Sequence, residues 1–500
     1  MKLENVLAGV NIKSLHGGLD KEINDVCINS LTAKKDCLFV AIKGYNKDGH
    51  DYIQNAVKNG ACAVLCENAD NFSEEVTYIF SDNIRKELST IAGNFYGTRQ
   101  NAKNLFITAI TGTNGKSSTA SILAYILNKN GIKCSMSSTT GMYIDADKIN
   151  DNLNTTPDAL TIHQFIKTSA EVGCKAVVIE ASAQASTLHR IDNIDFKYGI
   201  FTNLSPEHLD FYGSVEQYYK AKEAIMLTCQ VCIVNSDDVY GKRLIKKLKE
   251  LNKKVISYAI YNNADYEINI NSEDDKSIEY EIVHKREKYD VKISIPSEAW
   301  VYNSAAALIV ASLEGYDVEK LSKNIYECII PAGRMEKIEN DLDLNIIIDY
   351  AHTLKAFETV LTNVKKNCKG RLISVFGCGG DRDKTNRPGI GKCVSEISDI
   401  CIITNDNPRS EDQISIFTDI ISGIKNKNYA IIQNRKEAIN LALNIATEAD
   451  TVIILGKGHE RYQIINNEYV PFDEKSIIQE ILSLRGKNGS CNDRESRESD

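Results

Sequence analysis

Short apolar runs rich in β-branched residues recur from about residue 105 onward, and each ends in a cluster of Gly, Asp, Asn, Thr or His. The runs are continuous rather than alternating, which is typical of strands buried on both faces, so they predict parallel sheets. Such runs occupy residues 105–110, 176–179, 199–201, 231–234, 346–348, 372–376, 400–403 and 452–455.

The segments between these runs favour helices. One of them, residues 117–130, is ended by Gly131, which is the residue that most often closes a helix. In sheets of parallel strands, ligands bind beyond the carboxyl ends of the strands. The polar clusters stand at those ends, so they are candidate site residues as a set.

The order of elements predicts an α/β protein with three domains and two main parallel sheets. Residues 1–103 form a smaller α/β unit, residues 104–329 contain the first parallel sheet, and residues 330–485 contain the second. Residues 266–295 alternate between apolar and polar positions, which predicts antiparallel hairpins appended to the first sheet. The tail, residues 486–500, is charged and poor in apolar residues, and we expect it to be disordered.

Composition narrows the class of protein. The 500 residues have a formal net charge of -9, which leaves no basic face for phosphates and argues against a nucleic-acid partner. The first residues lack a signal-peptide layout, and apolar stretches such as 305–313 are too short to span a bilayer. We therefore expect a cytoplasmic protein that does not bind membranes. The 14 cysteines lie mostly inside apolar runs, which favours buried free thiols over zinc ligands.

A glycine-rich segment after the first buried run carries the strongest local signal. It reads Gly112-Thr113-Asn114-Gly115-Lys116-Ser117 and stands between a predicted strand and a predicted helix. Backbone N–H groups of such a turn bind phosphate, Lys116 would reach the outer phosphates of ATP, and the Ser117 hydroxyl would hold Mg²⁺. The general P-loop pattern has a further glycine where this chain has Ile110, and a turn without a ligand is the alternative interpretation.

Three further residues stand after or near buried runs. Glu180 ends a strand, as a metal-coordinating acid would, and His208 lies in the cluster that follows the next strand. Lys222 lies on a helix expected to begin at Ser214, with Gln217 in capping-box position. Each has an ordinary alternative: a helix-capping acid, a loop histidine held by hydrogen bonds, and a solvated lysine.

These motifs together resemble the central domain of the Mur ligases. The strings that carry the resemblance are GTNGKS, Thr155-Thr156-Pro157, FTNLSPEHLD and Tyr219-Lys220-Ala221-Lys222. The resemblance implies a three-domain Mur ligase architecture with a central P-loop domain and a C-terminal Rossmann-like domain. It implies Lys116, His208 and a carbamylated Lys222 as catalytic residues, and Ser117, Glu180, His208 and Lys222 as Mg²⁺ ligands. It also implies an ATP site made of Gly112, Thr113, Asn114, Gly115, Lys116, Ser117, Ser118, Asn303, Arg334, Asp349 and His352.

The C-terminal third resembles the MurE type, the family members that add the third residue of the peptide stem. Its matching strings are Asp349-Tyr350-Ala351-His352-Thr353, FGCGGDRDK at 376–384, DNPR at 406–409 and GKGHE at 456–460. The DNPR string resembles that of enzymes adding meso-diaminopimelate, whose second carboxylate an arginine fork can bind at two points. The implied amino-acid site is Arg387, Asp406, Asn407, Pro408, Arg409, Gly456 and Glu460. The implied site for the UDP-linked substrate is Ser30, Thr155, Thr156, Ser182 and Arg190.

The chain departs from the family pattern mainly around the UDP-linked substrate. The family follows its metal-binding acid with Ser-Ser-His, whereas this chain has Ala181-Ser182-Ala183-Gln184 after Glu180. The family's Asp-Ser-Arg near the uridine reads Asn29-Ser30-Leu31 here, and Leu354 stands where a proline is expected. A paralogue with an altered acceptor is therefore kept as an alternative.

The resemblance implies a monomeric, ATP- and Mg²⁺-dependent ligase of peptidoglycan precursor synthesis. It would join meso-diaminopimelate to UDP-N-acetylmuramoyl-L-alanyl-D-glutamate through an acyl phosphate. A folylpolyglutamate-synthase-like ligase shares the central architecture, but the DNPR and GKGHE strings and the N-terminal unit argue against it. A P-loop ATPase leaves those strings unexplained. A Rossmann dehydrogenase is weaker still, because Arg382 and Arg461 stand where the third glycine of the dinucleotide motif is needed.

Overall fold

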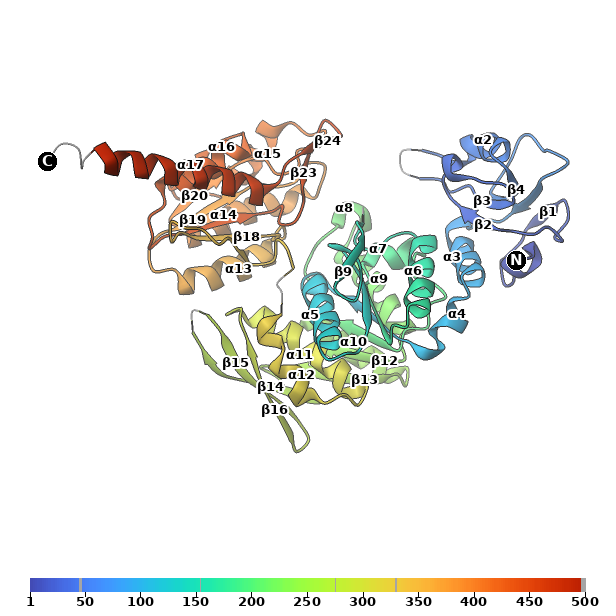
Figure 1. The fold of residues 1–500 in the computed structure, drawn as a ribbon, viewed down its shortest axis with the longest axis horizontal. Coiled ribbons are helices and arrows are strands. Elements are labelled where there is room, and N and C mark those ends of the chain that lie inside the picture. The colour runs from blue at the N-terminus through green and yellow to red at the C-terminus, as the bar shows by residue number, and fades with distance from the viewer. Residues whose placement is uncertain (45–46, 153, 275, 329–330, 496–500) are drawn as a thin grey trace.

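The computed structural model describes residues 1–44, 47–152, 154–274, 276–328 and 331–495, with side chains up to Arg485. Three α/β parts follow one another along the chain (Figure 1). The first contains a five-stranded sheet of order β1-β5-β4-β3-β2, with β1 antiparallel and the rest parallel. Its strands are β1 (Ser14–His16), β2 (Asp25–Cys27), β3 (Cys37–Val40), β4 (Ala61–Cys66) and β5 (Thr77–Phe80). Its helices include α1 (Leu3–Val6), α2 (Ile53–Lys58), α3 (Ile84–Phe95) and α4 (Thr98–Asn101).

The first and second parts share a hydrophobic core. Helix α3 packs against α6 (Ala159–Glu171) of the second part, and Ala159 and Leu160 belong to the N-terminal core cluster. The buried His163 ring bonds to the Ser89 hydroxyl at 3.2 Å and the Thr98 hydroxyl at 2.7 Å. Burial lowers the pKa of His163 to about 4, so the ring is neutral. Its hydrogen bonds join the first part to the second.

The second part is built on an eleven-stranded sheet of order β16-β15-β14-β13-β12-β11-β6-β10-β7-β8-β9. The strands from β14 through β7 are parallel, and β8, β9, β15 and β16 are antiparallel additions at the two edges. The parallel strands are β6 (Phe106–Thr111), β7 (Cys134–Ser138), β10 (Ala176–Glu180), β11 (Tyr198–Phe201), β12 (Val231–Asn235), β13 (Lys254–Ala259) and β14 (Tyr266–Glu273). The edge strands are β8 (Gly141–Ile144), β9 (Asp147–Asn150), β15 (Ile278–His284) and β16 (Glu287–Ile293).

Helices cover both faces of this sheet. They are α5 (Lys116–Lys129), α6, α7 (Ala183–Thr187), α8 (Leu209–Tyr212), α9 (Val215–Thr228), α10 (Val239–Glu250), α11 (Glu298–Leu313) and α12 (Val318–Lys323). Helix α11 is apolar on all sides and packs directly on α5. A helix buried all round needs such a composition, and its position brings Asn303 against the glycine-rich loop.

The third part contains a six-stranded sheet of order β17-β18-β22-β19-β20-β21, in which β17 alone is antiparallel. Its strands are β17 (Glu336–Lys337), β18 (Asn345–Asp349), β19 (Leu372–Phe376), β20 (Ile400–Ile403), β21 (Tyr429–Ile431) and β22 (Thr451–Leu455). A separate hairpin pairs β23 (Tyr462–Ile465) with β24 (Glu468–Pro471). The helices are α13 (Leu354–Asn367), α14 (Arg387–Ile397), α15 (Gln413–Ile421), α16 (Arg435–Ile445) and α17 (Glu474–Glu495).

The predicted α/β architecture is confirmed, and so are the antiparallel hairpins appended to the first parallel sheet. The tail expected to be disordered overlaps α17, which continues to Glu495, while residues 496–500 lie outside the described residues. Once a packed helix has formed, each further residue adds at little cost, which accounts for the extension. Among the described residues, the helices are all too short or too polar to cross a membrane.

Candidate active site

The glycine-rich loop joins β6 to α5 and is held in shape by the segment that follows β11. The Thr113 N–H donates to the Asn203 carbonyl at 2.9 Å, and the Asn114 N–H donates to the Asn203 side chain at 2.9 Å. The Thr202 hydroxyl donates to the Asn114 carbonyl at 2.6 Å. The Lys116 ammonium folds back onto the Thr113 carbonyl at 2.8 Å. The N-terminus of α5 therefore opens on a preformed loop, as an anion site requires.

Two glycines are needed for this loop on steric grounds. Gly112 has φ +148°, and a Cβ there would come within 1.9 Å of the Thr202 hydroxyl oxygen. Gly115 has φ +87°, and a Cβ there would come within 2.5 Å of Asn303 Oδ1. Both backbone conformations are costly for residues with a side chain. The loop can therefore approach its neighbours, and a phosphate, only if positions 112 and 115 are glycine.

Ser117 and Glu180 meet at the carboxyl ends of β6 and β10. The Ser117 hydroxyl donates to Glu180 Oε2 at 2.8 Å, and both side chains are buried. The same oxygen accepts from the Thr139 N–H at 2.9 Å and from the Thr139 hydroxyl at 3.1 Å. A hydroxyl beside a carboxylate is an oxygen donor set that suits Mg²⁺. The described residues contain no group of three His, Cys, Asp or Glu side chains that could hold a metal by themselves.

Lys222 is buried on α9 and points at the glycine-rich loop, with its ammonium 2.6 Å from the Gly112 carbonyl. Burial, together with the nearby positive charge of Lys116, lowers the pKa of Lys222 well below its usual value. A neutral amine is the form that reacts with CO₂, so this environment suits carbamylation. An ammonium would repel a metal ion, whereas a carbamate would supply an anionic oxygen ligand.

His208 lies beside Glu207 and takes a left-handed backbone conformation with φ +55°. Burial is the main cause that lowers the pKa of His208, and Lys222 is among the nearby charges that add to it. Glu207 reaches across to the third part of the chain, where its Oε1 lies 2.8 Å from His352 Nε2. Burial opposes ionisation of Glu207, but His352, with His208 and Lys116, holds the pKa of that carboxyl well below its usual range. The Glu207–His352 pair therefore links the second part to the third.

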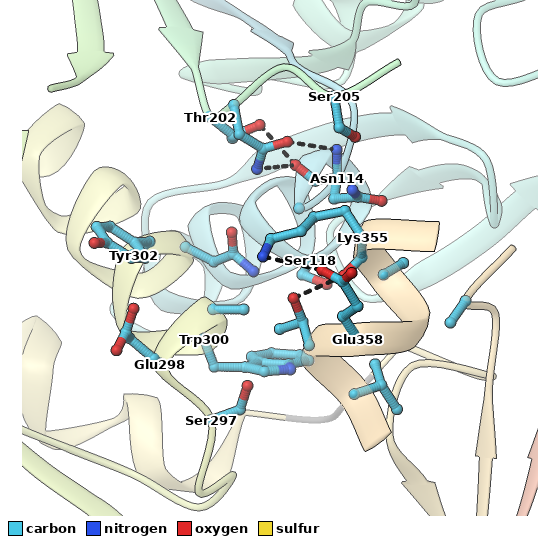
Figure 2. A pocket seen from close by; sticks show the side chains of 18 of the residues that line it. Asn114, Ser118, Thr202, Ser205, Ser297, Glu298, Trp300, Tyr302, Lys355 and Glu358 are labelled. Atoms are coloured by element: carbon cyan, nitrogen blue, oxygen red, sulfur yellow. Dashed lines mark hydrogen bonds and ion pairs between the residues drawn. The ribbon is translucent and has the colours of Figure 1, made fainter. Parts of the chain in front are cut away.

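The larger of two cavities at this junction lies between α5, α11 and α13 and has a volume of ≈ 650 Å³. Figure 2 shows Ser118 from α5, Tyr302 from α11, and Lys355 and Glu358 from α13 around it. Predicted ATP-site residues on its wall are Asn114, Gly115, Ser118, Asn303, Arg334 and Asp349. The Arg334 guanidinium stacks on the Tyr350 ring at 4.6 Å.

The smaller cavity, of ≈ 180 Å³, lies at the carboxyl ends of β19, β20 and β22 and is also lined by Glu207 and His208 of the second part. Its wall contains the predicted amino-acid residues Arg387, Asp406, Asn407, Arg409, Gly456 and Glu460. Asn407 Nδ2 donates to Glu460 Oε2 at 2.8 Å. Gly456, with φ +113°, leaves room for Asp406, whose Oδ2 would lie 2.4 Å from a Cβ there. Pro408, the remaining predicted residue of this site, precedes Arg409 and contributes its carbonyl beside Gly380.

The two predicted arginines of this site differ in their contacts. Arg387 is buried, and its two terminal nitrogens each donate to Glu411 at 2.8 Å. Its Nη1 also donates to Asp419 at 2.9 Å. Arg409 bonds to the Gly380 carbonyl at 2.7 Å and to the Asn407 carbonyl at 3.4 Å, and burial lowers its pKa. Arg409 binds no carboxylate among the described contacts, so it is the better candidate to receive one from a substrate.

Four of the five predicted residues for the UDP-linked substrate meet at the end of β10. The Thr156 hydroxyl bonds to the Glu180 carbonyl at 2.7 Å and to the Ser182 hydroxyl at 3.2 Å. Arg190 donates to the Thr156 carbonyl at 2.7 Å, and Thr139 donates to the Thr155 hydroxyl at 3.2 Å. The fifth, Ser30, belongs to the N-terminal part, where its described side-chain contact is with Asn55.

Sequence reasoning did not single out Glu207, Lys457 or Glu411. Glu207 connects two parts of the chain through His352. Lys457 donates to both Asn407 and Glu460. Glu411 accepts hydrogen bonds from both terminal nitrogens of Arg387. The signal for Lys457 was its place in the GKGHE string, two residues after a buried strand. The other two act through residues distant in sequence, which no local pattern reveals.

The glycine-rich loop has the form of a phosphate-binding loop, and the Ser117–Glu180 pair lies beside it. The loop faces a second sheet across two cavities. This arrangement defines a nucleotide-dependent enzyme whose site lies between domains.

Models of three Mur ligase domains match the chain in order. They are "Mur ligase family, catalytic domain" over residues 22–95, "Mur ligase middle domain" over 110–311 and "Mur ligase, glutamate ligase domain" over 333–458. The relative from Clostridium perfringens, named UDP-N-acetylmuramoyl-L-alanyl-D-glutamate–2,6-diaminopimelate ligase, is 37% identical over 96% of this chain and 99% of its own length.

A relative of the same name from Clostridioides difficile is 36% identical over 97% of this chain and 100% of its own length. A solved structure titled as that ligase aligns with TM-score 0.68 and 27% identity over 97% of this chain and 99% of that one. The fold is also that of MurF from Thermotoga maritima in complex with ADP, at TM-score 0.64 and 19% identity over 92% of this chain and 98% of that one. The chain belongs to the Mur ligase family, and it is an ATP-dependent ligase.

Proposed function

We propose that this Mur ligase adds meso-diaminopimelate to UDP-N-acetylmuramoyl-L-alanyl-D-glutamate, a step of peptidoglycan precursor synthesis. The observation that carries the proposal is the ≈ 180 Å³ cavity, which Arg409 and Glu460 line together. The end of diaminopimelate that does not react has one carboxylate and one ammonium group. A guanidinium and a carboxylate in one small cavity match that pair of charges. The names of the relatives at 35–37% identity support the same substrate pair.

The proposed reaction has two steps, and negative charge on the phosphates must be stabilised during the first. An oxygen of the D-glutamate side-chain carboxylate attacks the γ-phosphorus of ATP, ADP leaves, and an acyl phosphate forms. The amine of diaminopimelate then attacks the acyl carbon, phosphate leaves, and the nitrogen loses a proton. Lys116 and the N–H groups of the glycine-rich loop stabilise the negative charge on the phosphates. Glu207 and His208 line the cavity from the second domain, and closing of the two domains would keep water from the acyl phosphate.

The residues present fit Mg²⁺ when Lys222 is counted as a carbamate. Ser117 and Glu180 already stand 2.8 Å apart in a buried site, and the Lys222 amine lies against the same loop. His208 would be the fourth member of the set. Bound Mg²⁺ would offset the repulsion between the attacking carboxylate and the phosphates. A monomer in the cytoplasm, with ATP and the UDP-linked dipeptide as soluble substrates, completes the proposal.

The test of the proposed function is phosphate release by the purified protein with ATP, Mg²⁺ and the UDP-linked dipeptide. Three reactions are compared: with meso-diaminopimelate, with L-lysine and with no amino acid. Release that requires both the dipeptide and diaminopimelate is the expected result. Release without an amino acid, or equal release with lysine, would contradict the proposal.

A second candidate function is a paralogue with a different acceptor. It is favoured by Leu31, which is 78% exposed where the family pattern has an arginine, next to the predicted Ser30. It is also favoured by Gln184, which replaces a histidine near Thr156 and Ser182. Clostridium acetobutylicum has two relatives of this chain, numbered 1 and 2, both at 36% identity. No phosphate release with this dipeptide, together with release when diaminopimelate and a different carboxylate acceptor are supplied, would select the paralogue.

Arg409→Ala is expected to raise the KM for diaminopimelate about 10- to 100-fold, because a charge-assisted hydrogen bond contributes about 1.5–3 kcal/mol. The KM for ATP is expected to stay unchanged, since Arg409 does not line the ≈ 650 Å³ nucleotide cavity. Steady-state kinetics with each substrate varied in turn measures both constants. Arg461→Ala, which removes an 85% exposed arginine of the same domain, is the matched control. An equal rise of the KM for ATP and the KM for diaminopimelate would contradict the assigned contact between Arg409 and diaminopimelate.

A further inference from the structure

Lys457 is a buried charge that the proposed reaction does not use. It lies two residues after the end of β22 and has no exposed side-chain surface. Its ammonium donates to Asn407 Oδ1 at 2.9 Å and to Glu460 Oε2 at 3.0 Å. A lysine is costly to bury unless its charge is paired and its protons are bonded. The placement of Lys457 therefore has to be explained by what it does to its two partners.

Lys457, Asn407 and Glu460 form a closed triangle in which each side chain binds the other two. Asn407 Oδ1 accepts from Lys457 and from the Ile464 N–H at 3.0 Å, so this oxygen is fully occupied. The Asn407 amide nitrogen is thereby turned toward Glu460, and donates to its Oε2 at 2.8 Å. The rotamers of Asn407 and Glu460 are thus both set by the ammonium behind them.

The triangle leaves the two Glu460 oxygens in different states. Oε2 accepts from both Lys457 and Asn407. In the described part of the chain, Oε1 has one hydrogen bond, a long one of 3.5 Å from the Tyr350 hydroxyl. Asn407 and Glu460 line the ≈ 180 Å³ cavity, whereas Lys457 stands behind its wall. Oε1 is therefore the acceptor that Glu460 can offer to a ligand.

We infer that Lys457 is a positioning residue that holds Glu460 so that its Oε1 can accept a hydrogen bond from the ammonium of the non-reacting end of the incoming diamino acid. The inference rests on the proposed function, because it takes diaminopimelate as the ligand. Lys457 acts through Asn407 and Glu460 and does not touch the substrate. By positioning Glu460, Lys457 makes the site selective for an amino acid with a second ammonium group. Arg409 binds the second carboxylate.

The experiment compares diaminopimelate with 2-aminopimelate, which has the same two carboxylates and lacks the second ammonium group. Lys457→Met removes the charge at nearly constant volume, and Lys457→Gln is a second variant that keeps a hydrogen-bond donor. Lys436→Met, on α16 of the same domain and paired with Glu480 at the surface, is the matched control. The kcat and KM for both amino acids and the KM for ATP are measured for each protein, together with its thermal unfolding.

In Lys457→Met, the KM for diaminopimelate is expected to rise about 10- to 100-fold, the loss typical of a hydrogen bond to a charged group. The constants for 2-aminopimelate and ATP stay near wild type, so the preference for diaminopimelate shrinks by the same factor. Equal losses with both amino acids, or none, would overturn the positioning role and leave the proposed function intact. A wild-type protein that does not use diaminopimelate would overturn both, and the wild-type reaction alone reveals it. If Lys457→Met does not fold, the same comparison in Lys457→Gln decides.

Discussion

Lys116→Ala is expected to lower ATP turnover at least about 10³-fold, because it removes the cation that faces the transferred phosphate. In the structure the Lys116 ammonium rests on the Thr113 carbonyl at 2.8 Å, from which it can swing onto a phosphate without disturbing the fold. The stability of the variant should therefore be close to that of the wild type. Phosphate release in the presence of all substrates measures the first effect, and thermal unfolding measures the second.

The matched control for Lys116 is Lys129→Ala, at the other end of the same helix. Lys129 is about half exposed and forms a surface pair with Glu327, and such pairs contribute little. Its activity should equal that of the wild type. If Lys116→Ala retained wild-type turnover, the loop would not be the phosphate site.

Lys222→Ala is expected to lower ligase activity about 10²- to 10³-fold, the range for removing a group that places charge at a reacting phosphate. Added short carboxylic acids should restore part of it, because they can occupy the cavity left by the side chain and supply the carboxylate that carbamylation would provide. Rescue requires that the lost group be an anion, which an unmodified lysine is not. Activity titrated against acetate or formate, with ATP and Mg²⁺ saturating, measures the effect.

Lys220→Ala is the control for this variant, since Lys220 lies on the same helix and is exposed. It should be fully active and insensitive to added acids. A folded Lys222→Ala protein that no carboxylic acid restores would argue for the other role open to Lys222, support of the glycine-rich loop through its 2.6 Å bond to the Gly112 carbonyl.

The parallel strands were predictable because burial on both faces leaves a clear trace in sequence. The run at 372–376 is β19 (Leu372–Phe376) residue for residue, and the runs at 176–179 and 231–234 each fall one residue short of β10 and β12. Strand β7 was missed because three of the five residues in its sequence, Cys-Ser-Met-Ser-Ser, carry a hydroxyl side chain. Those serines are buried, and Ser135 bonds to Ser169 at 2.7 Å. Hydrogen bonds to other elements thus allow serine hydroxyls to be buried in a strand whose sequence is mostly polar.

The site was predictable to the extent that its residues lie at strand ends. Glu180 ends β10, Ser117 lies in the first turn of the helix that follows the neighbouring strand β6, and the structure brings the two side chains to 2.8 Å. The sequence could not distinguish Arg387 from Arg409, because their difference lies in Glu411, which neutralises only the first. It also could not show that His352 and Glu207, which are 145 positions apart, would pair. Local patterns identify which residues carry chemistry, and only packing decides which of them stay free.

The smaller cavity draws its walls from two domains, with Asn407 and Glu460 on one side and Glu207 and His208 on the other. An inhibitor that filled it and bound both walls would do more than displace the amino acid. It would hold the domains at one separation and block the opening that product release needs. Its affinity would depend on residues from two separately folded sheets, so resistance could arise by mutation in either. The same residues serve the natural substrate, which limits the substitutions that an active enzyme can accept.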